Sequence, residues 1–386
     1  MVSPGSPSVV QSTQSGARRL SELDALRGLA ALSVVLWHFF CATYTLPEAW
    51  GRLFMVVYWV TRGDGAVVLF FVLSGFVLSL PFIEGRGLSY RVFVIRRICR
   101  IYLPYLAGIG LSILAVTFVA QTKRPGLSDW LNQVFDVPFR PWTALEHLFL
   151  VGNIHSNAYN NAIWSLIQEM RVSLLFPLIF WVVSRNRVVV NLGLCILLSG
   201  LYTCCSHFQI EQDNGYQTGY CFSLHVIGLF IVGMLLARHR GGLTRAYRRL
   251  PTVAKVIALL LGVGLYRMSL ERKIVFFRDY GAATGAAVFI ISALGSARLS
   301  AFLKRPFFTF LGNISYAMYL NHITVIIVVM AWAYPAWPLW GLELTIVAAT
   351  LSMSLPFWCY AEKPAIRLGR ILTRPRSPAP SIAHNS

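Results

Sequence analysis

The sequence predicts an all-α integral membrane protein, a polytopic helix bundle that crosses the bilayer about ten times. Hydrophobic residues make up 56% of the chain and charged residues only 13%, against about 25% charged residues in an ordinary soluble domain. Mean hydropathy is +0.61. Apolar windows long enough to cross a membrane also recur along the whole chain. They lie near residues 25–46, 64–82, 101–120, 163–184, 188–205, 222–237, 253–266, 279–297, 308–331 and 341–359.

The distribution of positive charge predicts that both termini lie in the cytoplasm. With the N-terminus inside, this ten-span threading places most of the 34 Lys and Arg residues on the cytoplasmic side, as the positive-inside rule requires. The net charge of +19 therefore indicates membrane topology and contact with membrane lipid, and no nucleic-acid partner is expected. We expect a multi-pass protein of the bacterial cytoplasmic (inner) membrane.

One membrane domain, residues 20–371, is expected between two disordered cytoplasmic tails, residues 1–19 and 372–386. The first tail is rich in Ser, Gly, Pro and Gln and lacks the basic start and apolar stretch of a signal peptide. The seven cysteines show no paired metal spacing, so no metal site is expected. Most cysteines are expected to fill apolar space, although Cys204 or Cys205 could bridge to Cys221.

The first span, "LDALRGLAALSVVLWHFF", carries Arg27 near its start and His38 well inside. Eleven residues make about three helical turns, so the two side chains share one face about 16 Å apart along the axis. An imidazole titrates near neutrality and can act as general base toward a hydroxyl. The alternative is a neutral core histidine bonded to a neighbouring helix.

An arginine cluster follows the second span in "YRVFVIRRICRIYLPY" and includes Arg91, Arg96, Arg97 and Arg100. Such a cluster usually sets topology or binds anionic lipid. It could equally form a phosphate clamp, because guanidinium groups bind phosphate bidentately and Arg96 and Arg100 lie on one helical face. A phosphate-rich acyl carrier would fit there.

The span "NNAIWSLIQEMRVSLLFP" contains a buried acid, Glu169, on the same face as Ser165. Glu169 and Arg171 point about 200° apart and cannot pair within one helix, so Glu169 must find its partner on another span. It either orients a histidine or forms an ion pair that sets helix register. Arg171 is expected to serve packing or register.

A polar stripe of Ser315, Tyr319 and His322 lies at i, i+4 and i+7 on the apolar helix of "LGNISYAMYLNHITVII". His322 is a candidate site residue, and a core imidazole is the equal alternative. For Tyr319 a place in the interfacial aromatic belt is the simpler interpretation. The pair Ser74-Gly75 lacks the Gly-x-Ser-x-Gly elbow, and no nucleotide-binding loop or zinc motif occurs.

Six stretches together resemble the acyltransferase 3 family of multi-span membrane acyltransferases, over about residues 20–371. In the family's order they are "LDALRGLAALSVVLWHF", "LFFVLSGFVL", "FVIRRICRIYLPY", "WSLIQE", "LGNISYAMYLNH" and "YAEKPAIRL". In one departure, Ala66, Val67 and Val68 stand where many members carry Gly-Val-Asp, so no acid acts there.

This resemblance implies an enzyme that moves an acyl group, usually acetyl, from cytoplasmic acyl-coenzyme A to a hydroxyl of a glycan or other acceptor at or across the membrane. Acyl-coenzyme A would be a co-substrate, and no bound cofactor is implied. The family's motif residues correspond to Arg27, His38, Arg97, Arg100, Trp164, Ser165, Leu166, Glu169, His322, Glu362, Lys363 and Pro364, with Arg96 adjoining.

We therefore predict a membrane O-acyltransferase in which His38, Glu169 and His322 form the catalytic group and His38 is the general base. Substrate binding is expected at Arg27, Arg96, Arg97, Arg100, Trp164, Ser165 and Tyr319. A transporter of free or lipid-linked saccharide is the alternative, because ten helices with buried polar groups also suit a transport pathway. A membrane scaffold is a second alternative. The arginine cluster and the lack of repeat symmetry favour the enzyme.

Overall fold

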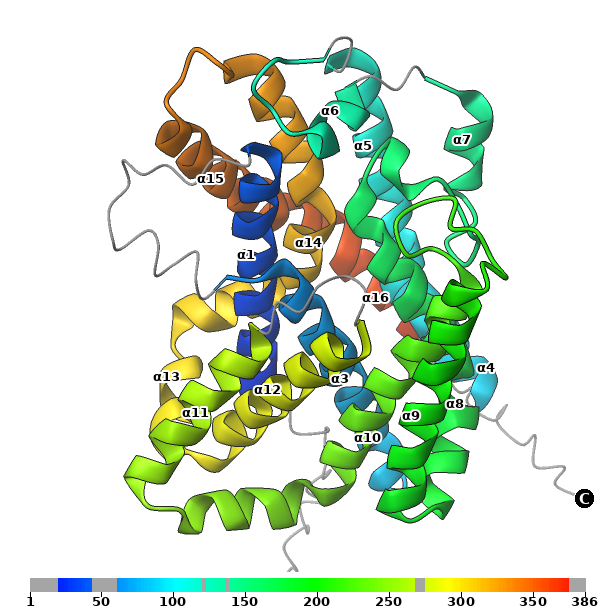
Figure 1. The fold of residues 1–386 in the computed structure, drawn as a ribbon, viewed down its shortest axis with the longest axis vertical. Helices are drawn as coiled ribbons and strands as arrows, with labels where there is room; N and C mark the ends of the chain where they lie inside the picture. Colours follow the sequence, from blue (N-terminus) through cyan, green and yellow to red (C-terminus); the bar gives the residue numbers. More distant parts are fainter. Residues whose placement is uncertain (1–19, 44–60, 120–122, 136–138, 268–274, 375–386) are drawn as a thin grey trace, which may run out of the picture.

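The computed structural model describes residues 20–43, 61–119, 123–135, 139–267 and 275–374, which form helices and loops with no β-strand among them. Figure 1 shows a bundle of long helices with shorter helices at its edges. The α-helices are α1 (Ser21–Thr43), α3 (Gly63–Ile83), α4 (Tyr90–Arg97), α5 (Leu103–Val119), α6 (Asp129–Phe135), α7 (Pro141–Glu146), α8 (Trp164–Arg185), α9 (Val188–His207), α10 (Tyr220–Arg249), α11 (Thr252–Tyr266), α12 (Val275–Gly295), α13 (Ala297–Leu303), α14 (Pro306–Ala333), α15 (Leu339–Phe357) and α16 (Lys363–Leu372). Shorter turns are π-helical, η2 (Ile98–Tyr102) and η6 (Trp358–Glu362), or 3-10 helical, η3 (Ser156–Ala158) and η4 (Asn161–Ile163).

The predicted all-α multi-pass membrane bundle is confirmed, and each predicted span falls on a helix. In the described residues, eight helical segments are long and apolar enough to cross a membrane, or nine if α12 and α13, bent by 96°, count as one. α11 is apolar but shorter than these segments. Its 15 residues span only about 22 Å. The predicted tails lie outside the described residues, except for residues 372–374, which end and follow α16.

The core follows the packed series α14, α1, α3 and α10, and α1 packs against α14 through glycine. A Cβ atom at Gly28 would lie 2.5 Å from the Leu311 carbonyl carbon, and one at Gly312 would lie 2.6 Å from the Asp24 carbonyl carbon. Small residues let two membrane helices approach to backbone contact. This contact sets the relative positions of the Arg27–His38 face of α1 and the polar stripe of α14.

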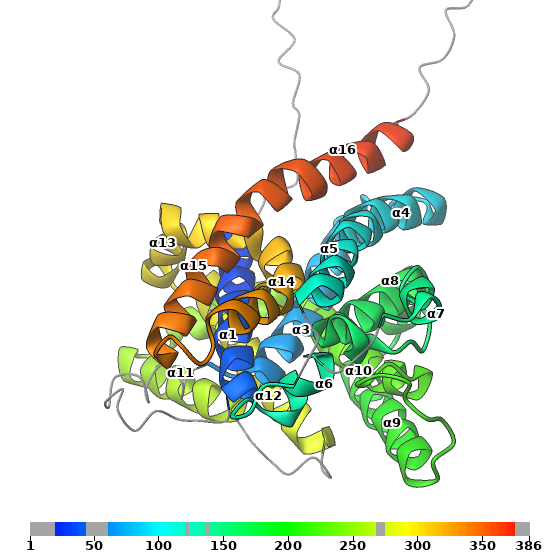
Figure 2. The same cartoon turned by 90° about the horizontal axis from the view of Figure 1, so that it is seen from above.

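Two π-helical turns lie near one another at the junctions α4–α5 and α15–α16. α16 packs beside α4 (Figure 2). A Cβ at Gly369 would approach the Cys99 Cβ at 3.0 Å, and Arg96 Nε donates to Thr373 Oγ1 at 2.9 Å. The arginine cluster and the C-terminal helix therefore border the same space.

Arg171 fixes the start of α10, as expected of a packing residue. Its guanidinium donates to the carbonyl oxygens of Val151, Thr218 and Gly219 at 2.8–2.9 Å. It also stacks over the Tyr220 ring, 4.1 Å from the centroid. All seven cysteines are free thiols in the structure, so the alternative of a disulfide to Cys221 is not realised there.

Candidate active site

His38 and His322 meet between α1 and α14. His322 Nε2 lies 3.1 Å from His38 Nδ1, and the two ring centroids are 4.9 Å apart. His322 is fully buried and His38 is half-buried. Two of the three predicted catalytic side chains are thus in contact, although they lie 284 residues apart in the sequence.

The hydrogen-bond network assigns the tautomers of this pair. The Tyr319 carbonyl oxygen can only accept, so His322 Nδ1, 2.6 Å away, carries hydrogen. In neutral His322, Nε2 then accepts from His38 Nδ1, which also lies 3.0 Å from the Val34 carbonyl oxygen. His38 Nε2 is left with its lone pair and has no hydrogen-bond partner among the described residues. That nitrogen has the electronic state that a general base requires.

Trp130 of α6 stacks on the His38 ring, at 5.5 Å between centroids and 28° between planes. α6 is held against the end of α1 because the Ser128 amide donates to the Ala42 carbonyl oxygen at 2.9 Å. In Figure 1 the end of α1 and α6 both lie in the upper part of the drawing. Sequence analysis missed Trp130, since a single tryptophan in a loop-borne short helix gives no periodic signal.

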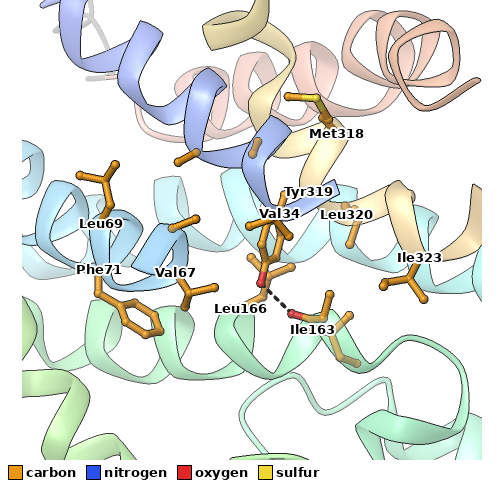
Figure 3. Close-up of a cluster of buried hydrophobic side chains, with 14 of the residues drawn as sticks. Val34, Val67, Leu69, Phe71, Ile163, Leu166, Met318, Tyr319, Leu320 and Ile323 are labelled. Carbon is orange, nitrogen blue, oxygen red and sulfur yellow. Dashed lines mark hydrogen bonds between the residues drawn. The ribbon is translucent and has the colours of Figure 1, made fainter. Parts of the chain in front are cut away.

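Ser165 and Tyr319, predicted on separate spans, are directly bonded. Their hydroxyl oxygens are 2.6 Å apart, and Tyr319 also donates to the Ala162 carbonyl oxygen at 3.0 Å. Figure 3 shows the Tyr319 side chain among packed hydrophobic side chains, with its hydroxyl directed toward the segment that begins α8. Tyr319 is therefore a core residue whose carbonyl holds His322. Trp164 packs against the rings of Phe71, Tyr216 and Phe222.

Glu169 does not contact either histidine of the pair, so the first of its two predicted roles, to orient a histidine, has no contact to support it. Its Oε1 accepts from Arg97 Nη2 at 2.9 Å and from Ser74 Oγ at 3.1 Å. The alternative of an ion pair to another helix is the one realised, because α4 brings Arg97 to this acid. Arg97 also donates to Ser173 Oγ at 2.7 Å and is 8% exposed. Both bonds come from Nη2, and Arg97 Nε is buried without a hydrogen-bond partner among the described residues.

A cavity of about 1360 Å³ opens between α1, α3, α4, α14 and α16. Nine of its lining side chains are Arg or Lys and three are Asp or Glu, so its charge suits an anion. The predicted residues Arg27, Arg96, Arg97 and Arg100 all line it. Among the described residues, the Arg27 and Arg100 guanidinium groups have no hydrogen-bond or ion-pair partner, and both are available to a ligand.

The predicted site residues on α1 and α14 form two groups, one at the basic cavity and one at the histidine pair. Arg27 and His38 lie on α1 about 16 Å apart along the axis. On α14, Tyr316 lines the cavity and His322 lies six residues, about 1.7 turns, further along. α1 and α14 therefore run together from the basic cavity to the histidine pair.

Several buried charged groups escaped the sequence analysis. His225 Nε2 lies 3.2 Å from Asp279 Oδ2, and Arg278 Nε donates to Asp279 Oδ1 at 2.7 Å. Asp279 and Arg278 begin an apolar window, which made them look like boundary residues. His225 lies inside a span, and its presence there was a signal that could have found it. Glu362, which the family resemblance had included among the motif residues, is 5% exposed and lines the cavity.

Comparison with known proteins gives a family model that matches residues 20–359, described as an acyltransferase domain. The chain belongs to this family of membrane acyltransferases. The match begins just before α1 and ends within η6, and so it includes both histidines and the arginine cluster. The predicted family resemblance is confirmed. No solved structure matches the chain.

Two curated relatives share parts of the chain. The acyltransferase MdmB of Streptomyces mycarofaciens is 29% identical over 170 residues, which are 44% of this chain and 41% of that protein. The putative peptidoglycan O-acetyltransferase YrhL of Bacillus subtilis (strain 168) is 26% identical over 196 residues, which are 48% of this chain and 28% of that protein. The matched regions therefore cover less than half of either relative.

Proposed function

We propose that this chain transfers an acyl group, acetyl in the first instance, from acyl-coenzyme A in the cytoplasm to a hydroxyl group of a glycan or other acceptor. The reaction takes place in the bacterial cytoplasmic membrane, with both termini on the cytoplasmic side. The single observation that carries the proposal is the pair of facing helices, α1 and α14, which join a basic cavity to two hydrogen-bonded histidines.

The basic cavity supports acyl-coenzyme A as the donor. Guanidinium groups bind phosphate with parallel hydrogen bonds, and Arg27 and Arg100 are unpaired among the described residues. The cavity's 1360 Å³ exceeds the roughly 300–1,000 Å³ of a site for a drug-sized ligand, so it has room for a large carrier. With the phosphates held there, the flexible arm of the carrier would extend along α1 toward His38.

His38 Nε2 is the proposed base. It takes the proton of the acceptor hydroxyl as the hydroxyl oxygen attacks the thioester carbonyl carbon. A C–O bond forms, the C–S bond breaks, and the leaving thiolate takes up the proton. His322 accepts from His38 Nδ1 and so keeps the lone pair on Nε2.

The first experiment measures thioester consumption by the purified protein with acetyl-coenzyme A and a hydroxyl acceptor. Loss of a general base lowers the rate by about a hundredfold or more, so His38→Ala should reduce consumption by that factor with normal membrane insertion. His239→Ala, at an exposed histidine of α10, is the matched control. Retention of more than about half of the wild-type rate in His38→Ala would exclude this role.

A further inference from the structure

Glu362 is a buried acid in the basic cavity, at the end of the π-helical turn η6. Its exposure is 5%, and Oε2 is buried without a hydrogen-bond partner among the described residues. Buried carboxylate oxygens are nearly always hydrogen-bonded, so an unpartnered one needs a physical explanation. π-helical turns occur frequently at functional sites.

The neighbouring arginines do not supply the missing partner. Arg27 and Arg100 line the same cavity, yet neither forms an ion pair with Glu362 among the described residues. Elsewhere in this cavity an acid is paired, since Glu84 Oε1 lies 3.2 Å from Arg240 Nη2. Among the described residues, Glu362 thus keeps an unused acceptor oxygen, and the two arginines keep unused N–H donors.

We propose that Glu362 accepts a hydrogen bond from an N–H group of the acyl-coenzyme A donor. This inference rests on the proposed function and adds a residue that recognises the donor by a group other than its phosphates. A carboxylate only accepts hydrogen bonds and repels phosphate. Its complement is therefore an N–H donor on a molecule whose phosphates bind Arg27 and Arg100.

Coenzyme A offers such N–H groups at two places, the adenine amine and the amides of the pantetheine arm. A lipid with an amine headgroup would also combine N–H and phosphate. The excess of cations over acids in the cavity favours the carrier, because a zwitterionic headgroup has no net charge to balance it whereas the carrier bears several phosphates.

A purely electrostatic role for Glu362 predicts the opposite effect on donor binding. If Glu362 only offsets the charge of the arginines, its removal leaves the cavity more positive and should lower the KM for acyl-coenzyme A. If it accepts a hydrogen bond from the donor, removal should raise that KM. The sign of the change separates the two roles.

The test measures kcat and KM for acetyl-coenzyme A in wild-type protein, Glu362→Ala and Glu362→Met. A lost hydrogen bond to a charged group corresponds to about a tenfold to hundredfold rise in KM, and kcat should change by no more than about twofold because Glu362 is not near the reacting atoms. Glu362→Met keeps the side-chain length, removes both acceptor oxygens and remains decisive if Glu362→Ala fails to fold. Glu343→Met replaces another buried acid, in α15 outside this cavity, and should leave KM unchanged.

A second donor, acetyl-pantetheine, distinguishes the two sources of N–H. Acetyl-pantetheine retains the amides and lacks the adenine. If Glu362 contacts an amide, Glu362→Ala should also raise the KM for acetyl-pantetheine. If Glu362 contacts the adenine, the KM for acetyl-pantetheine should be the same in Glu362→Ala and wild type. Unchanged or lowered KM for acetyl-coenzyme A in both Glu362 variants would overturn the inference. If wild-type protein consumes no thioester, the proposed function itself fails, which is a different outcome.

Discussion

At the scale of single residues, the His38 ring is bonded to a histidine rather than to an acid. Hydrogen bonds run from His38 Nδ1 to His322 Nε2 and from His322 Nδ1 to the Tyr319 carbonyl oxygen. These two hydrogen bonds hold the histidine rings in place and leave His38 Nε2 unprotonated. Glu169 is occupied by Arg97 and Ser74 instead.

His322 is therefore expected to act by positioning His38. His322→Ala should lower kcat substantially with little change in the KM for acyl-coenzyme A. In His322→Gln an amide oxygen can take the place of Nε2 and accept from His38, so activity should recover in part. Steady-state kinetics of the two variants check this, and equal kcat values for Ala and Gln would contradict the positioning role.

Arg97 and Arg100 are expected to respond differently to replacement by lysine. Lysine keeps the charge and loses the bidentate fork. Arg100→Lys should raise the KM for acyl-coenzyme A by about tenfold, the loss of one charge-assisted hydrogen bond, because Arg100 lines the cavity without a partner among the described residues. Arg97→Lys should mainly lower the midpoint of thermal unfolding, since Arg97 is bound to Glu169 and Ser173.

The control for these two variants is Arg91→Lys. Arg91 lies in α4 and outside the cavity lining, so KM should not change there. An unchanged KM in Arg100→Lys would mean that the arginine cluster serves topology or lipid binding and not the donor.

At the scale of helices, the α1–α14 contact decides how the two halves of the site are aligned. Gly28→Ala should destabilise the protein by about 1–3 kcal/mol, because the new methyl group meets backbone atoms of α14 that cannot move easily. Thermal unfolding in detergent measures this effect. Gly110→Ala in α5 is the matched control, since a Cβ there meets nothing within 4 Å. Equal unfolding midpoints for the two variants would show that the α1–α14 contact tolerates a side chain.

At the scale of the whole molecule, the arrangement predicts that the two substrates arrive from opposite sides of the membrane. The positive-inside rule predicts that the arginine-rich end faces the cytoplasm, and the histidine pair lies toward the other end of α1. In inside-out vesicles, acyl-coenzyme A added outside should be consumed when acceptor is enclosed in the lumen, and acylated product should accumulate there. Movement of unmodified saccharide without thioester consumption would instead identify a transporter.

Sequence alone determined the helices, the membrane character, the family and half of the cavity-facing arginines, because hydropathy, helical period and charge are local properties of the chain. Tertiary structure alone decided which side chains meet. Glu169 binds Arg97 and not a histidine, Trp130 covers His38, and Glu362 Oε2 has no hydrogen-bond partner within the described part of the chain. These outcomes depend on how closely α1 and α14 approach at Gly28 and Gly312 and on where short helices such as α6 pack. Interhelical contact of this kind joins residues hundreds of positions apart, and no local pattern in the sequence encodes it.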